Sequence, residues 1–164
     1  MAVVALGSNL GDPVGNVRAA ISRLRGLAAG DWRCSSLWRT TPVDCPDGSP
    51  AFINAVVAFR AGPEKTPETL LGQLQEIERE FGRRPKRVLN EARPLDLDLI
   101  AFGAAVRSSP QLTLPHPRAL RRRFVLAPLA EILPRLVLPG EEWTVAWHLA
   151  RLESGEVIER MEEV

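Results

Sequence analysis

The sequence predicts an α+β fold, in which a mostly antiparallel sheet carries helices on both faces. Apolar runs of strand length come in groups, and two longer segments with helical spacing separate these groups. This order favours a layered sheet-and-helix architecture. The chain has 164 residues, 45% of them hydrophobic, which is enough for one domain with its own core. We therefore expect a single domain over residues 1–164.

The first predicted elements are a strand and a helix. Residues 2–6 form an apolar run, followed by a turn with two glycines at residues 7–11. Asp12 and Pro13 are typical of a helix cap and a first helical position, and apolar residues then recur at helical spacing up to Leu27. The turn lacks the spacing of a dinucleotide-binding loop and the Lys-Ser/Thr of a P-loop, so its spacing alone predicts only a tight turn.

Two strands and a second helix are expected next. Residues 32–40 predict one strand, and residues 52–59 predict a strongly apolar one with a single polar residue, Asn54. This amide can pair with a heterocycle or can satisfy a local backbone group, and the residues leave both roles open. A helix is expected from the Thr-Pro-Glu cap at residues 66–68 to the glycine at position 82.

Asp96 and Asp98 interrupt the apolar run of the next predicted strand. Side chains alternate between faces along a strand, so both carboxylates point one way while Leu95, Leu97 and Leu99 point into a core. Two ionised carboxylates on one face repel each other, and a Mg²⁺ ion would remove that repulsion. An exposed edge strand with a solvated polar face is the alternative, and the octet alone leaves it open.

Basic residues gather around these aspartates, although the net charge of the whole chain is only +1. Residues 83–123 contain ten basic and three acidic residues, which suits a polyanionic ligand held through a metal. The low net charge argues against a nucleic-acid partner, and no apolar run approaches the length of about 20 residues that spans a membrane. With only two cysteines and no basic leader segment, we expect a cytoplasmic protein.

The C-terminal part predicts shorter elements. Gly103 indicates a hairpin turn from which the chain returns at residues 106–107, and residues 108–115 look like a loop. His116 lies between two prolines, and the residues allow either a phosphate donor or a turn residue there. Short helices are expected up to residue 133 and over 143–152, and a last strand over 156–161. The βαββαβ order of the earlier elements is that of a ferredoxin-like core.

Several short motifs follow one another along nearly the whole chain. They are Gly7-Ser8-Asn9-Leu10-Gly11, Arg39-Thr40-Thr41-Pro42, Phe52-Ile53-Asn54-Ala55, Gln75-Glu76-Ile77-Glu78, Arg93-Pro94-Leu95-Asp96-Leu97-Asp98 and Leu114-Pro115-His116-Pro117. Each motif is unspecific alone. Their joint order and spacing resemble those of the 6-hydroxymethyl-7,8-dihydropterin pyrophosphokinases, a family of folate biosynthesis.

The resemblance implies a reaction and a set of site residues. The family transfers the pyrophosphoryl group of ATP to the hydroxymethyl oxygen of the pterin and releases AMP, with two Mg²⁺ ions. The resemblance assigns the metals to Asp96 and Asp98, and catalysis to these aspartates with Arg83 and Arg93. The implied pterin-binding residues are Thr40, Pro42, Val43, Phe52, Asn54 and Phe124. The implied ATP-binding residues are Gln75, Glu78, Arg93, Thr113, His116 and Arg122. We expect small-molecule substrates, no nucleic acid or membrane partner, and a monomer.

The chain also departs from the family pattern. Residues 89–92 read Leu-Asn-Glu-Ala where the family often has Arg-Trp-Gly-Pro, so the usual arginine and tryptophan of this basic loop are missing. Arg84 or Arg87 is a candidate substitute for that arginine. Pro117 and Phe52 stand where the family often has tyrosine.

Three other functions are compatible with parts of the sequence. The paired aspartates would also suit a metal-dependent phosphohydrolase or nuclease, and the basic segment a nucleic-acid binder. The altered loop would also suit a family member that binds its substrates but has lost catalysis.

Overall fold

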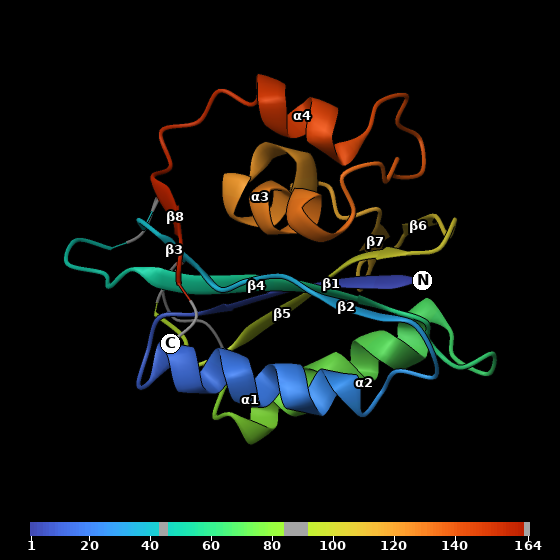
Figure 1. Cartoon of the computed structure of the whole chain (residues 1–164). Helices are drawn as coiled ribbons and strands as arrows, with labels where there is room; N and C mark the ends of the chain where they lie inside the picture. Colours follow the sequence, from blue (N-terminus) through green and yellow to red (C-terminus); the bar gives the residue numbers. More distant parts are fainter. Residues whose placement is uncertain (43–45, 84–91, 163–164) are drawn as a thin grey trace.

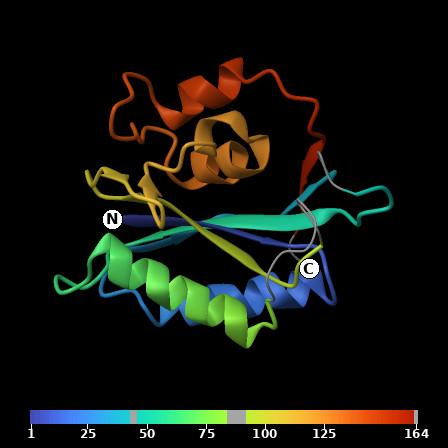
Figure 2. The ribbon, with the colours of Figure 1, turned by 180° about the vertical axis from the view of Figure 1, so that it is seen from behind.

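An antiparallel sheet forms the middle layer of the molecule, and helices cover both of its faces (Figure 1). The computed structural model describes residues 1–42, 46–83 and 92–162. The strands of the sheet are β1 (Ala2–Ser8), β2 (Trp32–Cys34), β3 (Trp38–Thr40), β4 (Phe52–Phe59), β5 (Asp96–Phe102) and β8 (Ile158–Arg160). Helices α1 (Pro13–Arg25) and α2 (Pro67–Glu80) lie side by side under one face, as the view from behind also shows (Figure 2). Helix α3 (Arg123–Ile132) lies on the other face, and α4 (Val145–Arg151) packs outside it.

The strand order is β5-β1-β4-β3-β8, with β2 beside β4, and all described pairs are antiparallel. Two β-α-β connections, β1-α1-β2/β3 and β4-α2-β5, place β1 and β4 in the middle of the sheet. This arrangement confirms the predicted ferredoxin-like core with helices on both faces.

The sheet separates two apolar cores because side chains alternate along its strands. In β1, Ala2, Val4 and Leu6 belong to the core that faces α1 and α2, whereas Val3 and Ala5 face α3. The predicted inward leucines, Leu95 just before β5 and Leu97 and Leu99 within it, belong to the core under α1 and α2. Asp96 and Asp98 must therefore point to the α3 face of the sheet.

The starts of the first two helices follow their predicted caps. The Asp12 carboxylate accepts from the Gly15 N–H at 3.1 Å, and the side chains of Thr66 and Thr69 form a reciprocal capping box. Helix α1 ends at Arg25, earlier than its apolar spacing predicts, and Leu27 packs partly buried after it.

The prediction of one continuous strand over residues 32–40 is wrong. The chain forms β2 and β3, and the three residues between them lie opposite only two residues of β4. The hydroxyl of Ser35 explains the break, because it accepts from the Val56 N–H at 2.9 Å and so replaces a backbone acceptor of the ladder.

The predicted return of the chain after Gly103 is also wrong. The chain turns there, but Arg107–Ser108 (β6) pairs with Thr113–Leu114 (β7), inside the segment predicted as a loop. A Ser109–Leu112 backbone hydrogen bond of 3.0 Å closes this small hairpin. The predicted short helices and last strand are confirmed as α3, α4 and β8.

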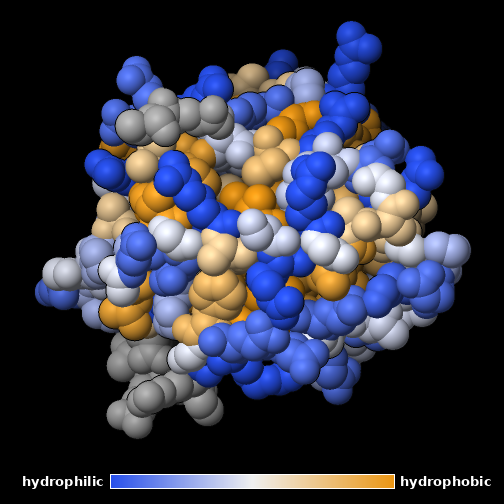
Figure 3. Space-filling model, turned by 60° about the horizontal axis from the view of Figure 1, so that its bottom comes forward, coloured by the Kyte–Doolittle hydropathy of each residue, from blue (hydrophilic) through white to orange (hydrophobic). Residues whose placement is uncertain are grey.

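The surface under α1 and α2 mixes residue types. Figure 3 shows hydrophobic residues there in small patches among hydrophilic ones. Among the helices of the described residues, none is long and apolar enough to cross a membrane.

Candidate active site

A row of functional side chains crosses the α3 face of the sheet at one end. Gly7 of β1 pairs with Asp96 of β5 on one side and with Asn54 of β4 on the other. Directly paired residues share a face, so the carboxylate and the amide flank a position that has no side chain. A Cβ at Gly7 would lie 3.1 Å from Asn54 Oδ1 and 3.8 Å from Phe52 Cδ1. The missing side chain of Gly7 therefore leaves room for the Asn54 side chain to lie over β1.

Asn54 bonds Thr40, another of the predicted pterin-binding residues. Its Nδ2 donates to Thr40 Oγ1 at 2.8 Å, and both side chains are buried. The amide of Asn54 therefore makes a local hydrogen bond, and its partner is a side chain and not a backbone group. Pro42 and Phe52 are half-buried nearby on the chain, and Val43 lies outside the described residues.

Phe124 approaches from the helix above the sheet. It lies in the first turn of α3 and packs partly buried against the core on that face. The guanidinium carbon of Arg122 lies 5.4 Å from the centre of its ring. The aromatic face is thus held on the same side of the sheet as Asn54.

Asp96 is held between two arginines. Arg83 Nη1 bonds both Asp96 Oδ1 and Glu78 Oε2, and Arg93 Nη1 lies 3.1 Å from Asp96 Oδ2. Glu78 is buried on α2, and its Oε2 also accepts from the Leu97 N–H at 3.0 Å. Glu78 therefore joins α2 to the backbone of β5 at Leu97, which lies between the two aspartates.

The carboxyl groups of the site differ in how readily they ionise. Burial and the negative charge of Asp96 raise the pKa of Glu78 to about 7, and they raise the pKa of Asp98 to about 6. Burial alone would also raise the pKa of Asp96, but Arg93 and Arg83 outweigh it and lower that pKa. Asp96 is therefore ionised near neutral pH, while ionising Asp98 and Glu78 carries a cost.

Asp96 and Asp98 fit Mg²⁺ as part of a shared site. Their carboxylate oxygens are hard ligands on one face, and a cation beside Asp98 would favour its ionised form. Within the described ranges, no group of three or more histidines, cysteines, aspartates or glutamates is arranged to hold a metal ion. A pair of carboxylates is the usual protein share of a magnesium site that phosphate oxygens and water complete.

Positive and neutral donors surround the aspartates. Arg122 and Arg93 lie close enough to favour the ionised form of Asp98. Burial, then the charges of Arg122 and Arg118, lower the pKa of His116. Its Nδ1 accepts from the Arg118 N–H at 3.2 Å, so the neutral ring carries its proton on Nε2.

Only some of the predicted ATP-binding residues lie near the two aspartates. Glu78, Arg93, His116 and Arg122 gather near the two aspartates. Gln75, predicted to share a site with Glu78, is exposed while Glu78 is buried. Thr113 is exposed in β7. Arg84 and Arg87, the candidate substitutes in the basic loop, lie outside the described residues.

Asn9 is a site residue that reasoning from the residues alone missed. Its Oδ1 accepts from the Arg93 N–H at 2.9 Å, its own N–H donates to the Arg93 carbonyl at 3.2 Å, and its amide reaches the Pro50 carbonyl at 3.4 Å. The glycine-containing turn therefore holds the start of β5 and the end of the loop before β4. An asparagine between two glycines was the available signal, but its partners are distant in sequence.

Comparison with known proteins gives one family model and several relatives that match most of the chain. Residues 3–134 match the family model described as 7,8-dihydro-6-hydroxymethylpterin-pyrophosphokinase. A 2-amino-4-hydroxy-6-hydroxymethyldihydropteridine pyrophosphokinase of Haemophilus influenzae is 38% identical over 142 residues, which cover 86% of each chain. A protein of the same name from Synechocystis is 40% identical over 145 residues, covering 88% of this chain and 72% of that protein.

Longer relatives carry the same region. A folate synthesis bifunctional protein of Arabidopsis thaliana is 35% identical over 162 residues, and the match covers 99% of this chain but 33% of that protein. The chain thus spans about a third of such relatives. The solved HPPK-DHPS of Plasmodium falciparum has a TM-score of 0.69 at 14% identity, over 92% of this chain and 42% of that one, which supports the fold.

Proposed function

The chain belongs to the 7,8-dihydro-6-hydroxymethylpterin-pyrophosphokinase family, and we propose that it transfers pyrophosphate from ATP to 6-hydroxymethyl-7,8-dihydropterin in folate biosynthesis. One observation carries the proposal. The paired carboxylates, Asp96 and Asp98, share a sheet face with Asn54, and Gly7, which has no side chain, lies between Asp96 and Asn54. Polyphosphate and pterin would therefore bind side by side on this face.

The pterin would bind between the sheet and α3. Asn54 presents a carbonyl and an amino group, which match the alternating acceptors and donors along a pterin edge. Phe124 offers an aromatic face on which a flat heterocycle can stack. Thr40 fixes the orientation of the amide through the 2.8 Å hydrogen bond. Pro42, Val43 and Phe52 are proposed to complete this site.

The triphosphate would bind at the aspartates. Mg²⁺ held by Asp96 and Asp98 would offset phosphate charge and orient the chain of phosphates. Arg83, Arg93 and Arg122 add fixed positive charge, and His116 in its neutral form can donate from Nε2 to a phosphate oxygen. Gln75, Glu78 and Thr113 stay proposed contacts of the nucleotide.

The proposed reaction depends mainly on aligning the pterin hydroxyl with the phosphates of ATP. In the proposed reaction the hydroxymethyl oxygen attacks the β-phosphorus and loses its proton to water. The bond from that phosphorus to the α–β bridging oxygen breaks, and AMP leaves with that oxygen. The arginines and aspartates hold the reacting groups in line and offset the developing charge, and such positioning supplies most of the rate enhancement in phosphoryl transfer. A monomeric state, a cytoplasmic location and a single domain stay predictions.

Product analysis tests the proposed reaction. Wild-type protein with ATP and Mg²⁺ should form AMP only when the pterin is present. Asp98→Asn should lower kcat/KM at least about a hundredfold, because it removes a charged ligand and its share of the charge compensation. Asp31→Asn is the matched control, since Asp31 pairs with Arg60 on the exposed surface and should leave turnover unchanged.

The products also separate the alternatives. ADP or inorganic phosphate formed without the pterin would contradict the proposal and indicate a phosphohydrolase. Tight binding of ATP and pterin without any product would show a family member that has lost catalysis.

A further inference from the structure

We propose that two carboxylates, Glu131 and Glu156, are positioning residues that set how far Phe124 lies from Asn54 and Thr40. They join helix α3 to strand β3 and to the chain beside it at two separate points. The inference rests on the proposed function, because it takes Phe124, Asn54 and Thr40 as pterin-binding residues.

Glu131 makes the first connection, near the end of α3. Its Oε1 accepts from the Ser36 hydroxyl at 2.6 Å and from the Ser36 N–H at 3.1 Å, and its Oε2 accepts from the Trp38 indole Nε1 at 3.0 Å. Trp38 is the Cα partner of Asn54 and stands two residues before Thr40 on the same strand. One carboxylate therefore ties α3 to the strand that carries Thr40.

The surroundings keep this carboxylate ionised. Burial alone would raise the pKa of Glu131, but its hydrogen bonds with Ser36 and Trp38 outweigh burial and lower that pKa. Arg160 of β8 adds a charge 3.7 Å from Oε1, and its Nε also donates to the Ser36 hydroxyl at 2.9 Å. Hydrogen bonds to an ionised acceptor are stronger than neutral ones, so Glu131 is well suited to fix the distance between α3 and β3.

Glu131 and Phe124 occupy the same stripe of α3. Seven residues are close to two helical turns, so both side chains face the sheet about 10 Å apart along the helix axis. Phe124 packs against the core on this face of the sheet, and Glu131 bonds Trp38 on the same face. A shift of the helix at Glu131 would therefore also shift the ring of Phe124.

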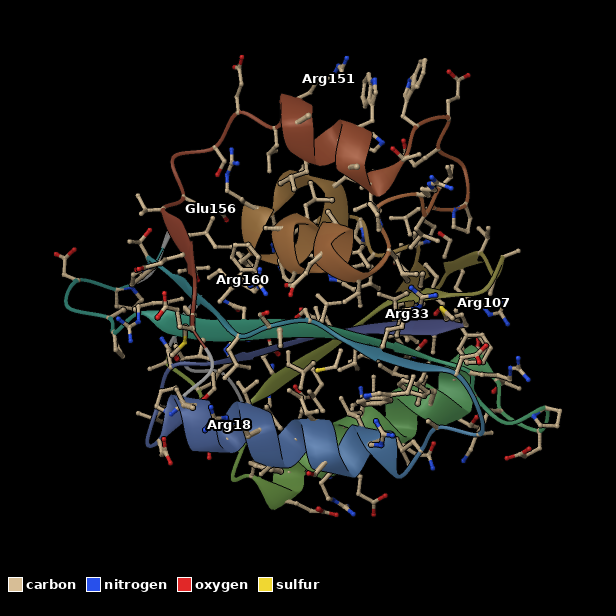
Figure 4. All side chains as sticks on the ribbon, viewed as in Figure 1. Arg18, Arg33, Arg107, Arg151, Glu156 and Arg160 are labelled. Atoms are coloured by element: carbon tan, nitrogen blue, oxygen red, sulfur yellow. The ribbon has the colours of Figure 1, made fainter. Side chains whose placement is uncertain are left out.

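Glu156 makes the second connection, at the start of α3. Its Oε2 accepts from the backbone N–H of Arg123, the first residue of the helix, at 2.6 Å. The helix has no capping bond from the side chain of Arg122, so Glu156 satisfies an N–H group that the helix itself leaves without an acceptor. Figure 4 shows Glu156 and Arg160 on the C-terminal segment, on the side of the sheet where α3 lies.

The residue after Glu156 completes the link to the sheet. Val157 N–H donates to Thr41 Oγ1 at 3.2 Å, and the Thr41 N–H donates to the Val157 carbonyl at 3.0 Å. Thr41 directly follows Thr40. The two carboxylates thus connect residues on either side of Phe124 to residues on either side of Thr40.

Separate binding measurements on the full chain test this arrangement. We would measure the Kd of 6-hydroxymethyl-7,8-dihydropterin, and that of a non-hydrolysable ATP analogue with Mg²⁺, by calorimetry. Glu131→Ala and Glu156→Ala should each weaken pterin binding about tenfold, because the ring of Phe124 is no longer pre-positioned. Affinity for the ATP analogue should change less than about twofold. Glu131→Gln keeps one acceptor oxygen and should weaken pterin binding less than Glu131→Ala.

Glu159→Ala is the control, since Glu159 is an exposed acidic residue of the same strand β8. Equal pterin affinity in the control and in folded Glu131 and Glu156 variants would overturn the inference and leave the proposed function intact. A parallel loss of pterin and ATP-analogue binding would also overturn it, because it would indicate general destabilisation. Wild-type protein that binds the ATP analogue but no pterin would instead contradict the proposed function. If Glu131→Ala does not fold, Glu156→Ala gives the same comparison, with the same expected loss of pterin affinity.

Discussion

Glu131 joins helix α3 to strand β3 through one side chain. Because this side chain is charged, its contribution to stability depends on pH. A carboxyl group whose pKa is lower in the folded than in the unfolded protein stabilises the fold above its unfolded pKa, about 4.3 for glutamate. That stabilisation is lost as the pH falls through the lower, folded pKa. Glu131 has a lowered pKa, so its contribution should be complete at neutral pH and vanish in acid.

The lowered pKa of Glu131 gives a prediction for the variant Glu131→Gln. Wild-type protein should be more stable than the variant at pH 7, and the difference in unfolding free energy should shrink below about pH 4. Urea unfolding at several pH values measures the difference. A gap that stays constant or widens in acid would show that the charge of Glu131 does not stabilise the fold.

Residue patterns predicted some of the site and missed the rest for a physical reason. The period of two along a strand was enough to place Asp96 and Asp98 on one face, opposite three core leucines. No local pattern could show that Glu78 bonds the Leu97 N–H, or that Asn9 holds Arg93. Those contacts join residues that are far apart in the chain and depend on how α2 and the first turn meet β5.

The break between β2 and β3 shows the same limit at the scale of elements. Residues 32–40 have the composition of one strand, and only the pairing with Val56 shows that the hydroxyl of Ser35 takes the place of a backbone acceptor. Helix starts were more predictable, because a cap acts within four residues of the chain. The two-residue strands β6 and β7 are too short to show any period.

The Ser35 contact predicts a cost in stability. Ser35→Ala would leave the buried Val56 N–H without its acceptor, and we expect a loss of about 1–3 kcal/mol in the free energy of unfolding. Ser22→Ala on the exposed side of α1 is the matched control and should be neutral or slightly stabilising, because alanine favours a helix more than serine does. Chemical denaturation measures both, and equal stabilities would mean that Val56 finds another partner.

At the scale of the whole molecule, the order of elements was enough to predict the ferredoxin-like core. The order of elements did not predict the position of α3, because the apolar face of this helix fits any exposed sheet surface. The structure places it over the face that carries Asp96, Asp98 and Asn54, so the site is formed between sheet and helix. The C-terminal segment then binds the start of α3 and the edge of β3, so residues beyond 134 hold the two elements that flank the proposed pterin site.

A crystal structure with Mg²⁺, a non-hydrolysable ATP analogue and the pterin would test whether both substrates bind on the α3 face of the sheet. We expect Mg²⁺ about 2.0–2.1 Å from carboxylate oxygens of Asp96 and Asp98, as octahedral coordination requires. We also expect the pterin ring between Asn54 and Phe124, with its hydroxymethyl oxygen facing the β-phosphorus. Ligands bound away from this face of the sheet, or a nucleotide held without either aspartate, would contradict the proposed site.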